Sequence, residues 1–327
     1  MRKTMQIYVD NVQPICYTMH EGRRTKMTNT SLTTYNASNY IQRFAQYIDA
    51  KPKTAQTYTR ALYQFAKWLQ VNDITAPTAE DVKTYRNDIA AAHKPATVQA
   101  YIFALRRFFE WTESENLYPN IAGKIKGAKI DRNPKKDYLT GNQVKDVLAC
   151  AAMQGKRNYA ILALMVTGGL RDIEVARANV EDVRTVGGNT VLFVQGKGRD
   201  EKNEYVILPA QTEKAIREYL KERGQVSGEE PLFCSESNNS RGGRMSTRSI
   251  SGICKIAMQE AGFDSDRLTA HSLRHTAITL ALIANGGNIQ EAQQFARHAS
   301  ITTTQIYAHN LEKAGNRCSR LVADSIF

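Results

Sequence analysis

The stretch Leu268-Thr-Ala-His271-Ser-Leu-Arg274-His275-Thr lies near the C-terminus, and Arg297-His298-Ala-Ser-Ile-Thr-Thr-Thr-Gln-Ile-Tyr307-Ala-His309 follows it. A spacing of three places His271 and Arg274 on one face of a helix, where both side chains could reach the same anion. The planar guanidinium of arginine suits phosphate, a tyrosine oxygen can act as a covalent nucleophile, and histidine can move protons. A His-x-x-Arg pair alone is more often a solvated helix face, so its interpretation depends on residues elsewhere in the chain.

The length and composition indicate a globular protein of two domains with a polyanionic partner. At 327 residues the chain exceeds what one hydrophobic core usually supports, and 42% hydrophobic with 23% charged residues is typical of globular proteins. Lysine and arginine number 44 against 32 acidic residues, and the net charge of +12 favours nucleic acid as the partner, with an acidic membrane surface second.

Neither membrane insertion nor secretion is indicated. No apolar run approaches the roughly 18 residues of a membrane-spanning helix, and the N-terminus lacks the long apolar core of a secretory signal. The five cysteines are scattered and include no Cys-x-x-Cys pair, which favours reduced thiols over a disulfide framework or a zinc knuckle. We therefore expect a cytoplasmic protein.

The N-terminal part of the chain predicts a leader followed by a helical domain. Residues 1–30 show no clear periodicity, and Met27 could serve as a second start. Apolar residues then recur at helical spacing through residues 31–122, which predicts four amphipathic helices with short connections and an aromatic core. Arg106 and Arg107 accompany the last apolar stripe, where they either face DNA or are ordinary surface arginines.

Residues 123–137 are predicted to be a basic linker between two domains. Glycine and proline break the helical period there while positive charge accumulates. Such a run is either solvated or follows a phosphate backbone. The basic residues of this segment are Lys124, Lys126, Lys129, Arg132, Lys135 and Lys136.

Residues 138–327 predict a second domain that mixes helices with a small sheet. The apolar run 159–166 predicts a buried helix, and a glycine turn after it places Arg171 at the start of the next helix, where backbone N–H groups and an arginine can share an anion. Residues 190–194 and 205–208 predict two paired strands, and Lys197 lies in their connection. Helices and a C-terminal tail follow.

Six residues of this domain occur in the order and spacing of the tyrosine recombinase (phage integrase) family, which the chain resembles over about residues 36–325. They are Arg171, Lys197, His271, Arg274, His298 and Tyr307. Thr-Gly-Gly-Leu-Arg171 resembles the family's first arginine box, His-Ser-Leu-Arg274 its second, and Ser-Ile-Thr-Thr-Thr-Gln-Ile-Tyr307 its nucleophile segment. One residue departs from the pattern: Arg297 stands where the family usually has glycine, directly before the second histidine.

The resemblance implies both the fold and the roles of the site residues. It implies a mainly α fold with a small β-sheet (α+β), in which a four-helix SAM-like core-binding domain and a mixed α/β catalytic domain form a clamp around DNA. Trimmed to Met27, the chain has the size of Xer-type members. Tyr307 would attack the phosphorus with help from His271, while Arg171 and Arg274 neutralise the growing charge.

Two further roles complete the implied reaction. Lys197 would protonate the departing 5′ oxygen, and His298 would hydrogen-bond the phosphate or stabilise its charge. Glu174, one turn after Arg171, is expected to brace either that arginine or the fold, and not to react itself. No metal ion or cofactor is implied, since the chain has neither a carboxylate cluster nor a Walker loop.

The implied protein is a site-specific DNA recombinase or integrase. It would cleave and rejoin double-stranded DNA through a 3′-phosphotyrosine and a Holliday junction, as a homotetramer or hetero-tetramer on two sites. A nicking and resealing enzyme of the type IB topoisomerase kind and a non-catalytic DNA-binding protein of the same fold remain alternatives. A third alternative is a metal-dependent hydrolase that uses four histidines: His271, His275, His298 and His309.

Overall fold

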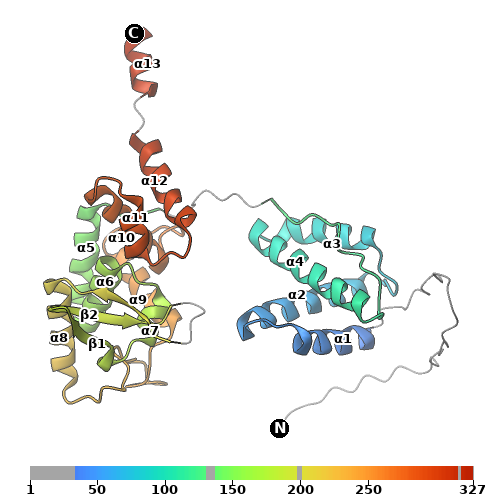
Figure 1. Cartoon of the computed structure of the whole chain (residues 1–327), viewed down its shortest axis with the longest axis horizontal. Coiled ribbons are helices and arrows are strands. Elements are labelled where there is room, and N and C mark those ends of the chain that lie inside the picture. Colours follow the sequence, from blue (N-terminus) through green and yellow to red (C-terminus); the bar gives the residue numbers. More distant parts are fainter. Residues whose placement is uncertain (1–33, 130–136, 197–200, 316–317, 327) are drawn as a thin grey trace. The chain divides into compact units, whose positions relative to one another are not determined.

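A computed structural model describes residues 34–129, 137–196, 201–315 and 318–326, and within these ranges the side chains of residues 34–36 and 310–320 are not described (Figure 1). The chain divides into two compact units, Met1–Asp131 and Arg132–Phe327. The predicted leader lies outside the described residues, and so do Arg132, Lys135, Lys136 and Lys197.

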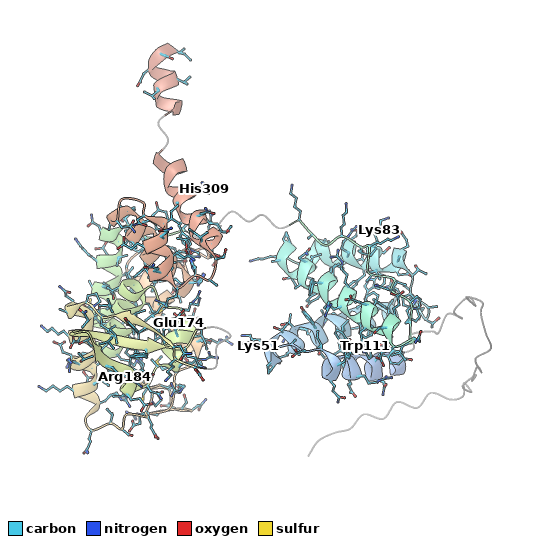
Figure 2. All side chains as sticks on the ribbon, viewed as in Figure 1. Lys51, Lys83, Trp111, Glu174, Arg184 and His309 are labelled. Carbon is cyan, nitrogen blue, oxygen red and sulfur yellow. The ribbon has the colours of Figure 1, made fainter. Side chains whose placement is uncertain are left out.

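Over residues 34–129 the first unit has four helices, as the sequence predicts. They are α1 (Thr34–Tyr47), α2 (Pro52–Val71), α3 (Ala79–Ala92) and α4 (Pro95–Ser114). Proline opens α2 and α4, where its missing N–H costs nothing, and Thr78 with Asp81 forms a capping box at the start of α3. The predicted aromatic stripe is core: Phe108 and Phe109 are buried, and Trp111, labelled in Figure 2, packs 5.7 Å from the Phe44 ring.

The segment after α4 packs against this helical unit. Ala122 is fully buried, and Ile125 is partly buried against the same core. Arg86 Nη1 donates to the Lys126 carbonyl oxygen at 3.1 Å, and an Arg106 guanidinium N–H donates to the Ile125 carbonyl oxygen. The first half of the predicted linker therefore follows the surface of the helical unit up to residue 129.

The described part of the second unit is mainly helical with a small sheet (Figure 1). Its antiparallel sheet has the strand order β1-β2-β3, with Phe193 opposite Tyr205 across the two predicted strands. The sequence did not predict β1, because only Val183 of its four residues is partly buried and no apolar alternation marks it. The elements are α5 (Gly141–Met153), α6 (Lys156–Gly168), α7 (Asp172–Arg177), η1 (Val180–Asp182), β1 (Val183–Val186), β2 (Asn189–Val194), β3 (Glu204–Ile207), α8 (Ala210–Arg223), α9 (Thr247–Glu260), α10 (Ala270–Ala284), α11 (Ile289–Ala296), α12 (Ile301–Gly315) and α13 (Cys318–Ile326).

Two hydrophobic clusters fix the positions of the candidate site residues. The larger one surrounds α6, which is buried nearly all round as predicted and packs against α5, α8 and α10. The smaller one joins α10, α11 and α12 and includes Tyr307 together with Ile278 and Ala296. Tyr307, which lies on α12, is thus held by packing against α10 and α11. Among the described residues, no helix is both long and apolar enough to cross a membrane.

Candidate active site

The turn between α6 and α7 begins the site. Gly169 ends α6 in the left-handed region, at φ 57° and ψ 34°. A Cβ atom at this position would lie 3.0 Å from the Phe295 ring, so the turn needs glycine both for its backbone conformation and for space. The turn places Arg171 at the N-cap of α7, with a quarter of its side chain exposed.

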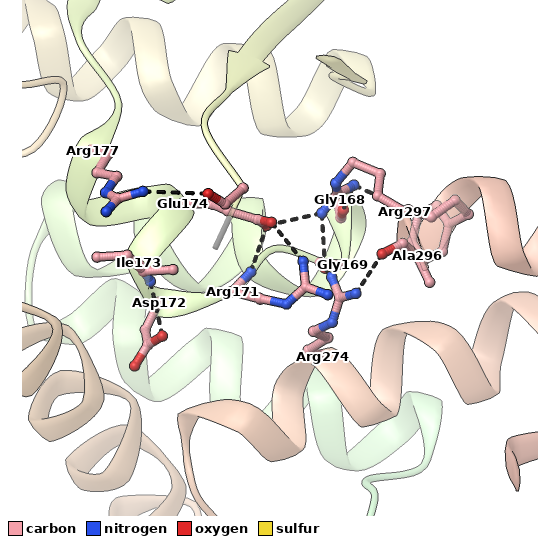
Figure 3. Close-up of polar contacts among 12 residues, drawn as sticks. Gly168, Gly169, Arg171, Asp172, Ile173, Glu174, Arg177, Arg274, Ala296 and Arg297 are labelled. Atoms are coloured by element: carbon pink, nitrogen blue, oxygen red, sulfur yellow. Dashed lines mark hydrogen bonds and ion pairs between the residues drawn. The ribbon is translucent and has the colours of Figure 1, made fainter. Parts of the chain in front are cut away.

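Glu174 braces Arg171 from inside the unit (Figure 3). Its buried carboxylate accepts from the Arg171 backbone N–H at 2.9 Å and from Arg171 Nη1 at 2.8 Å. Arg297 Nη2 donates to the same carboxylate at 3.0 Å. Burial raises the pKa of Glu174, but Arg297 and Arg171 outweigh it and the pKa is lowered. Glu174 is therefore an ionised brace.

Arg274 lies on α10 and is 1% exposed. Its two terminal nitrogens donate to the carbonyl oxygens of Gly169 and Ala296, which joins the α6–α7 turn to the end of α11. Burial lowers the pKa of Arg274 to about 9, and Arg171 and Arg297 contribute to that lowering. Its guanidinium remains charged at neutral pH, and these two contacts use two of its five N–H donors.

His298 follows the turn between α11 and α12 and is neutral at pH 7. Burial lowers its pKa to about 4, together with the positive charges of Arg274 and Arg171. Its Nδ1 lies 2.9 Å from Thr304 Oγ1, and its backbone N–H donates to the Gln293 carbonyl oxygen at 3.1 Å. A neutral imidazole can give or accept a hydrogen bond at a phosphate without adding charge.

Tyr307 is 8% exposed and faces the histidines of the site. Its ring lies 5.2 Å from the His275 ring and 6.1 Å from the His298 ring, measured between centroids. Burial raises the pKa of Tyr307, although Arg274 and Arg171 oppose that rise. The hydroxyl is therefore protonated at neutral pH and needs a base before it can act as a nucleophile.

His271 and His275 extend this series of rings along α10. The His271 ring lies 4.7 Å from the His275 ring, so the contacts run from Tyr307 through His275 to the exposed His271. Sequence reasoning assigned proton transfer to His271 and considered His275 only as a metal ligand. The signal for His275 was its position four residues after His271, on the same helical face.

The structure thus brings four of the six predicted residues together, with His271 at their edge and Lys197 outside the described residues. The four are Arg171, Arg274, His298 and Tyr307. No group of three or more histidine, cysteine or carboxylate side chains suited to a metal ion occurs within the described part of the chain. The histidines of the metal alternative accordingly form no such group there.

The residues predicted to bind DNA differ from one another in their surroundings. Arg106 is partly buried and donates to the Ile125 carbonyl oxygen, a contact that fixes the segment after α4. Arg107 is exposed, and its Nη1 lies 2.9 Å from Glu110 Oε2. The three described linker lysines lie on the segment that follows α4: Lys124, Lys126 and Lys129 are all exposed.

Comparison with known proteins identifies the class that this fold and site define. The profile of the phage integrase family matches residues 137–314, and the profile of the phage integrase N-terminal SAM-like domain matches residues 39–118. The chain belongs to the phage integrase family of tyrosine recombinases. This confirms the predicted fold class, a SAM-like helical domain followed by a mixed catalytic domain.

Named relatives agree with this membership. The tyrosine recombinase XerC of Pelobacter propionicus is 30% identical over 274 residues, which cover 79% of this chain and 85% of that protein. A tyrosine recombinase of Synechococcus elongatus is 29% identical over 202 residues, which cover 61% of this chain. The chain matches 62% of the length of that relative and 57% of a similar one from Synechocystis.

Solved structures share the fold at low identity. The XerH recombinase bound to a palindromic difH substrate superimposes with a TM-score of 0.67 at 22% identity, covering 85% of this chain and 83% of that one. A lambda integrase tetramer bound to a Holliday junction gives 0.63 at 17% identity, covering 83% of this chain and 76% of that one. At these identities the likeness concerns the fold alone.

Proposed function

We propose that the protein is a site-specific recombinase that breaks and rejoins double-stranded DNA through a covalent bond to Tyr307. The observation that carries this proposal is the position of the Tyr307 ring beside those of His275 and His298, close enough to Arg171 and Arg274 to feel their charge. Such a set provides a nucleophile, proton carriers and fixed positive charge for a phosphodiester.

The reaction would proceed by transfer of the phosphate from one oxygen to another. A neighbouring histidine takes the proton of the Tyr307 hydroxyl, and the phenolate oxygen bonds to phosphorus while the bond to the 5′ oxygen breaks. Arg171 and Arg274 neutralise the second negative charge that appears on the five-coordinate phosphate. The departing oxygen takes up a proton, which the family resemblance assigns to Lys197, and a 3′-phosphotyrosine remains.

Rejoining reverses these steps with a 5′ hydroxyl of a second strand, so the phosphodiester bond energy is kept. Exchange between two duplexes would require four active sites, and we propose a tetramer on two DNA sites that passes through a Holliday junction. The lambda integrase structure with a Holliday junction is a tetramer, which supports this proposal by analogy. The free thiols of Cys150, Cys234 and Cys254 fit the predicted cytoplasmic location.

A nicked duplex tests the covalent step. The protein would first select its binding site from a randomised duplex library, and the selected site would then be nicked so that cleavage releases a short strand and traps the adduct. Wild-type protein should give a protein–DNA adduct on a denaturing gel, with EDTA present, and mass spectrometry should place the DNA on Tyr307. Tyr307→Phe should bind the duplex and give no adduct.

The matched control is Tyr205→Phe, which removes the hydroxyl of an exposed tyrosine on β3 and should leave the yield of adduct unchanged. A normal yield from Tyr307→Phe would contradict the assignment. Relaxation of supercoiled plasmid without any exchange between two selected sites would instead favour the topoisomerase alternative.

A further inference from the structure

Arg297 ends α11 in a backbone conformation that normally selects glycine. Its φ of 53° and ψ of 46° lie in the left-handed region, which costs most residues about 1 kcal/mol or more. Among the described residues, the other non-glycine positions with positive φ are Asp73 and Asn116. Aspartate and asparagine tolerate this region because their short side chains bond to the local backbone, whereas arginine has no such advantage. The side chain of Arg297 must therefore contribute something that offsets the backbone cost.

The Arg297 side chain crosses from the α11–α12 turn to the α6–α7 turn (Figure 3). It is 6% exposed, and its Nη1 donates to the carbonyl oxygens of Gly168 at 3.2 Å and Phe295 at 3.0 Å. Its Nη2 donates to the Gly169 carbonyl oxygen at 3.2 Å and to Glu174 Oε2 at 3.0 Å. One guanidinium thus reaches both the turn before Arg171 and the carboxylate that braces Arg171.

A gain in folding stability does not by itself explain these contacts. The guanidinium is buried, which is costly for a charge, and its Nε has no acceptor among the residues described. Glycine would remove the backbone strain, the buried charge and the unpaired donor together. What arginine adds over glycine is the ion pair with Oε2 of Glu174, while Oε1 of the same carboxylate accepts from Arg171 Nη1.

We propose that Arg297 is a positioning residue for the phosphate site, which takes the place of glycine and fixes Arg171 through Glu174. This inference rests on the proposed function. Arg297 and Arg274 also donate to one shared acceptor, the carbonyl oxygen of Gly169, so the two turns are cross-linked from both sides. Arg297 therefore fixes the positions of Arg171 and Arg274 relative to each other.

The charge balance supports the same role. Glu174 alone would cancel one of the two positive charges on Arg171 and Arg274. With Arg297 present, three guanidinium groups and one carboxylate leave a net charge of two positive units, which matches the doubly negative phosphate of the transition state. Arg297 also contributes to holding His298 neutral.

The test compares Arg297→Gly with Arg297→Lys, Glu174→Gln and the double variant Arg297→Gly/Glu174→Gln. Single-turnover cleavage is measured on the nicked duplex with the selected site, beside duplex affinity and melting temperature. Arg297→Gly should cleave roughly ten- to a hundredfold more slowly, the loss typical when a partner behind a functional side chain is removed, with affinity and melting temperature little changed. The double variant should be no slower than the slower single variant, because both changes break one chain of contacts.

Arg297→Lys separates orientation from charge. Lysine keeps the positive charge but lacks the planar fork, so cleavage should fall clearly below wild type, although less far than in Arg297→Gly. NMR titration of the His298 ring should give a higher pKa in Arg297→Gly and an unchanged one in Arg297→Lys. Arg217→Ala is the matched control, since it removes an exposed arginine that pairs with Glu213 on α8 at 2.7 Å. Its cleavage rate should equal that of wild type.

Each outcome has a definite meaning. No adduct from wild-type protein would overturn the proposed function itself. An adduct from wild type, with equal cleavage rates in wild type and Arg297→Gly, would overturn only the role of Arg297. If Arg297→Gly melts far below wild type, the role of Arg297 is judged from the cleavage rates of Arg297→Lys and Glu174→Gln instead. A normal cleavage rate in Arg297→Lys would then overturn the proposal.

Discussion

Nδ1 of His298 lies 2.9 Å from Oγ1 of Thr304, a side chain that is fully buried. Thr304 precedes Tyr307 by one helical turn of α12, so both side chains belong to the same face of that helix. The contact fixes the orientation of the imidazole, and it connects the histidine expected at the phosphate to the helix that carries the nucleophile. Small shifts of α12 would therefore move Tyr307 and His298 together.

We expect Thr304→Val to slow covalent cleavage by roughly ten- to a hundredfold while the duplex is still bound, because valine keeps the shape but leaves the His298 Nδ1 without its partner. The measurement is the single-turnover rate of adduct formation on the nicked duplex. Thr303→Val is the matched control, since Thr303 is exposed one position earlier on the same helix. Equal effects of the two substitutions would mean that α12 is merely sensitive to valine.

The lowered pKa of His298 predicts how stability depends on pH. In the folded protein the pKa is about 4, against an ordinary value of about 6.5, so the unfolded chain binds more protons between these two values. Stability from this group is therefore complete above about pH 6.5 and is lost as the pH falls toward 4, by roughly 1–3 kcal/mol. Urea unfolding at pH 4.5 and pH 7 should show the loss in wild type and a smaller one in His298→Gln. The same loss in both proteins would assign it to other groups.

Much of the site could be predicted because its signals are local in the sequence. The helical spacing of His271 and Arg274, the glycine turn before Arg171 and the short interval between His298 and Tyr307 each depend on neighbouring residues. The same is true of the four helices of the first unit, since apolar periodicity reports which face is buried. These local patterns agree with the folded structure because tertiary packing stabilises the same helices and turns that the local sequence favours.

The parts that could not be predicted depend on contacts between distant segments. Arg297 and Glu174 are 123 residues apart, and only the fold shows that the arginine in place of glycine reaches that carboxylate. The contact of His275 with Tyr307 and the packing of Ile125 against the helical unit are likewise tertiary. Sequence patterns carry no distance between such segments, so the sequence alone shows neither the partner of Arg297 nor the contact of His275 with Tyr307.

The exposed lysines after α4 predict a salt-dependent contribution to DNA binding. Replacing Lys124, Lys126 and Lys129 together with glutamine should flatten the plot of log affinity against log salt by up to roughly 0.9 for each phosphate that a lysine no longer neutralises. Affinity measured between low and moderate salt checks this. The matched control replaces three cations of α8, Lys214, Arg217 and Lys221, which alternate with glutamates. An unchanged slope in the first triple variant would show that the run is only solvated.

The connection between β2 and β3 contains two lysines, Lys197 and Lys202, and we expect Lys197 to be the acid. Lys197 lies outside the described residues, but the chain is anchored on both sides of it: Arg177 Nη1 donates to the Gly196 carbonyl oxygen at 3.3 Å, and Lys202 Nζ lies 2.5 Å from the buried Asp182. Lys202 is thus committed to an ion pair. Lys197 is the lysine that the family pattern assigns to the departing 5′ oxygen.

We therefore expect Lys197→Ala to slow cleavage by roughly 10²–10⁴-fold, the usual yield of general acid catalysis. It should recover on a substrate whose scissile 5′ oxygen is replaced by sulfur, because a thiolate leaves without a proton. Arg171→Ala should not recover there, since the phosphate charge still needs neutralising, and Lys202→Ala should show no selective recovery. Single-turnover rates of the variants on both substrates form a cycle. Equal recovery of Lys197→Ala and Arg171→Ala, or none for Lys197→Ala, would remove Lys197 as the acid and make His298 the next donor to test.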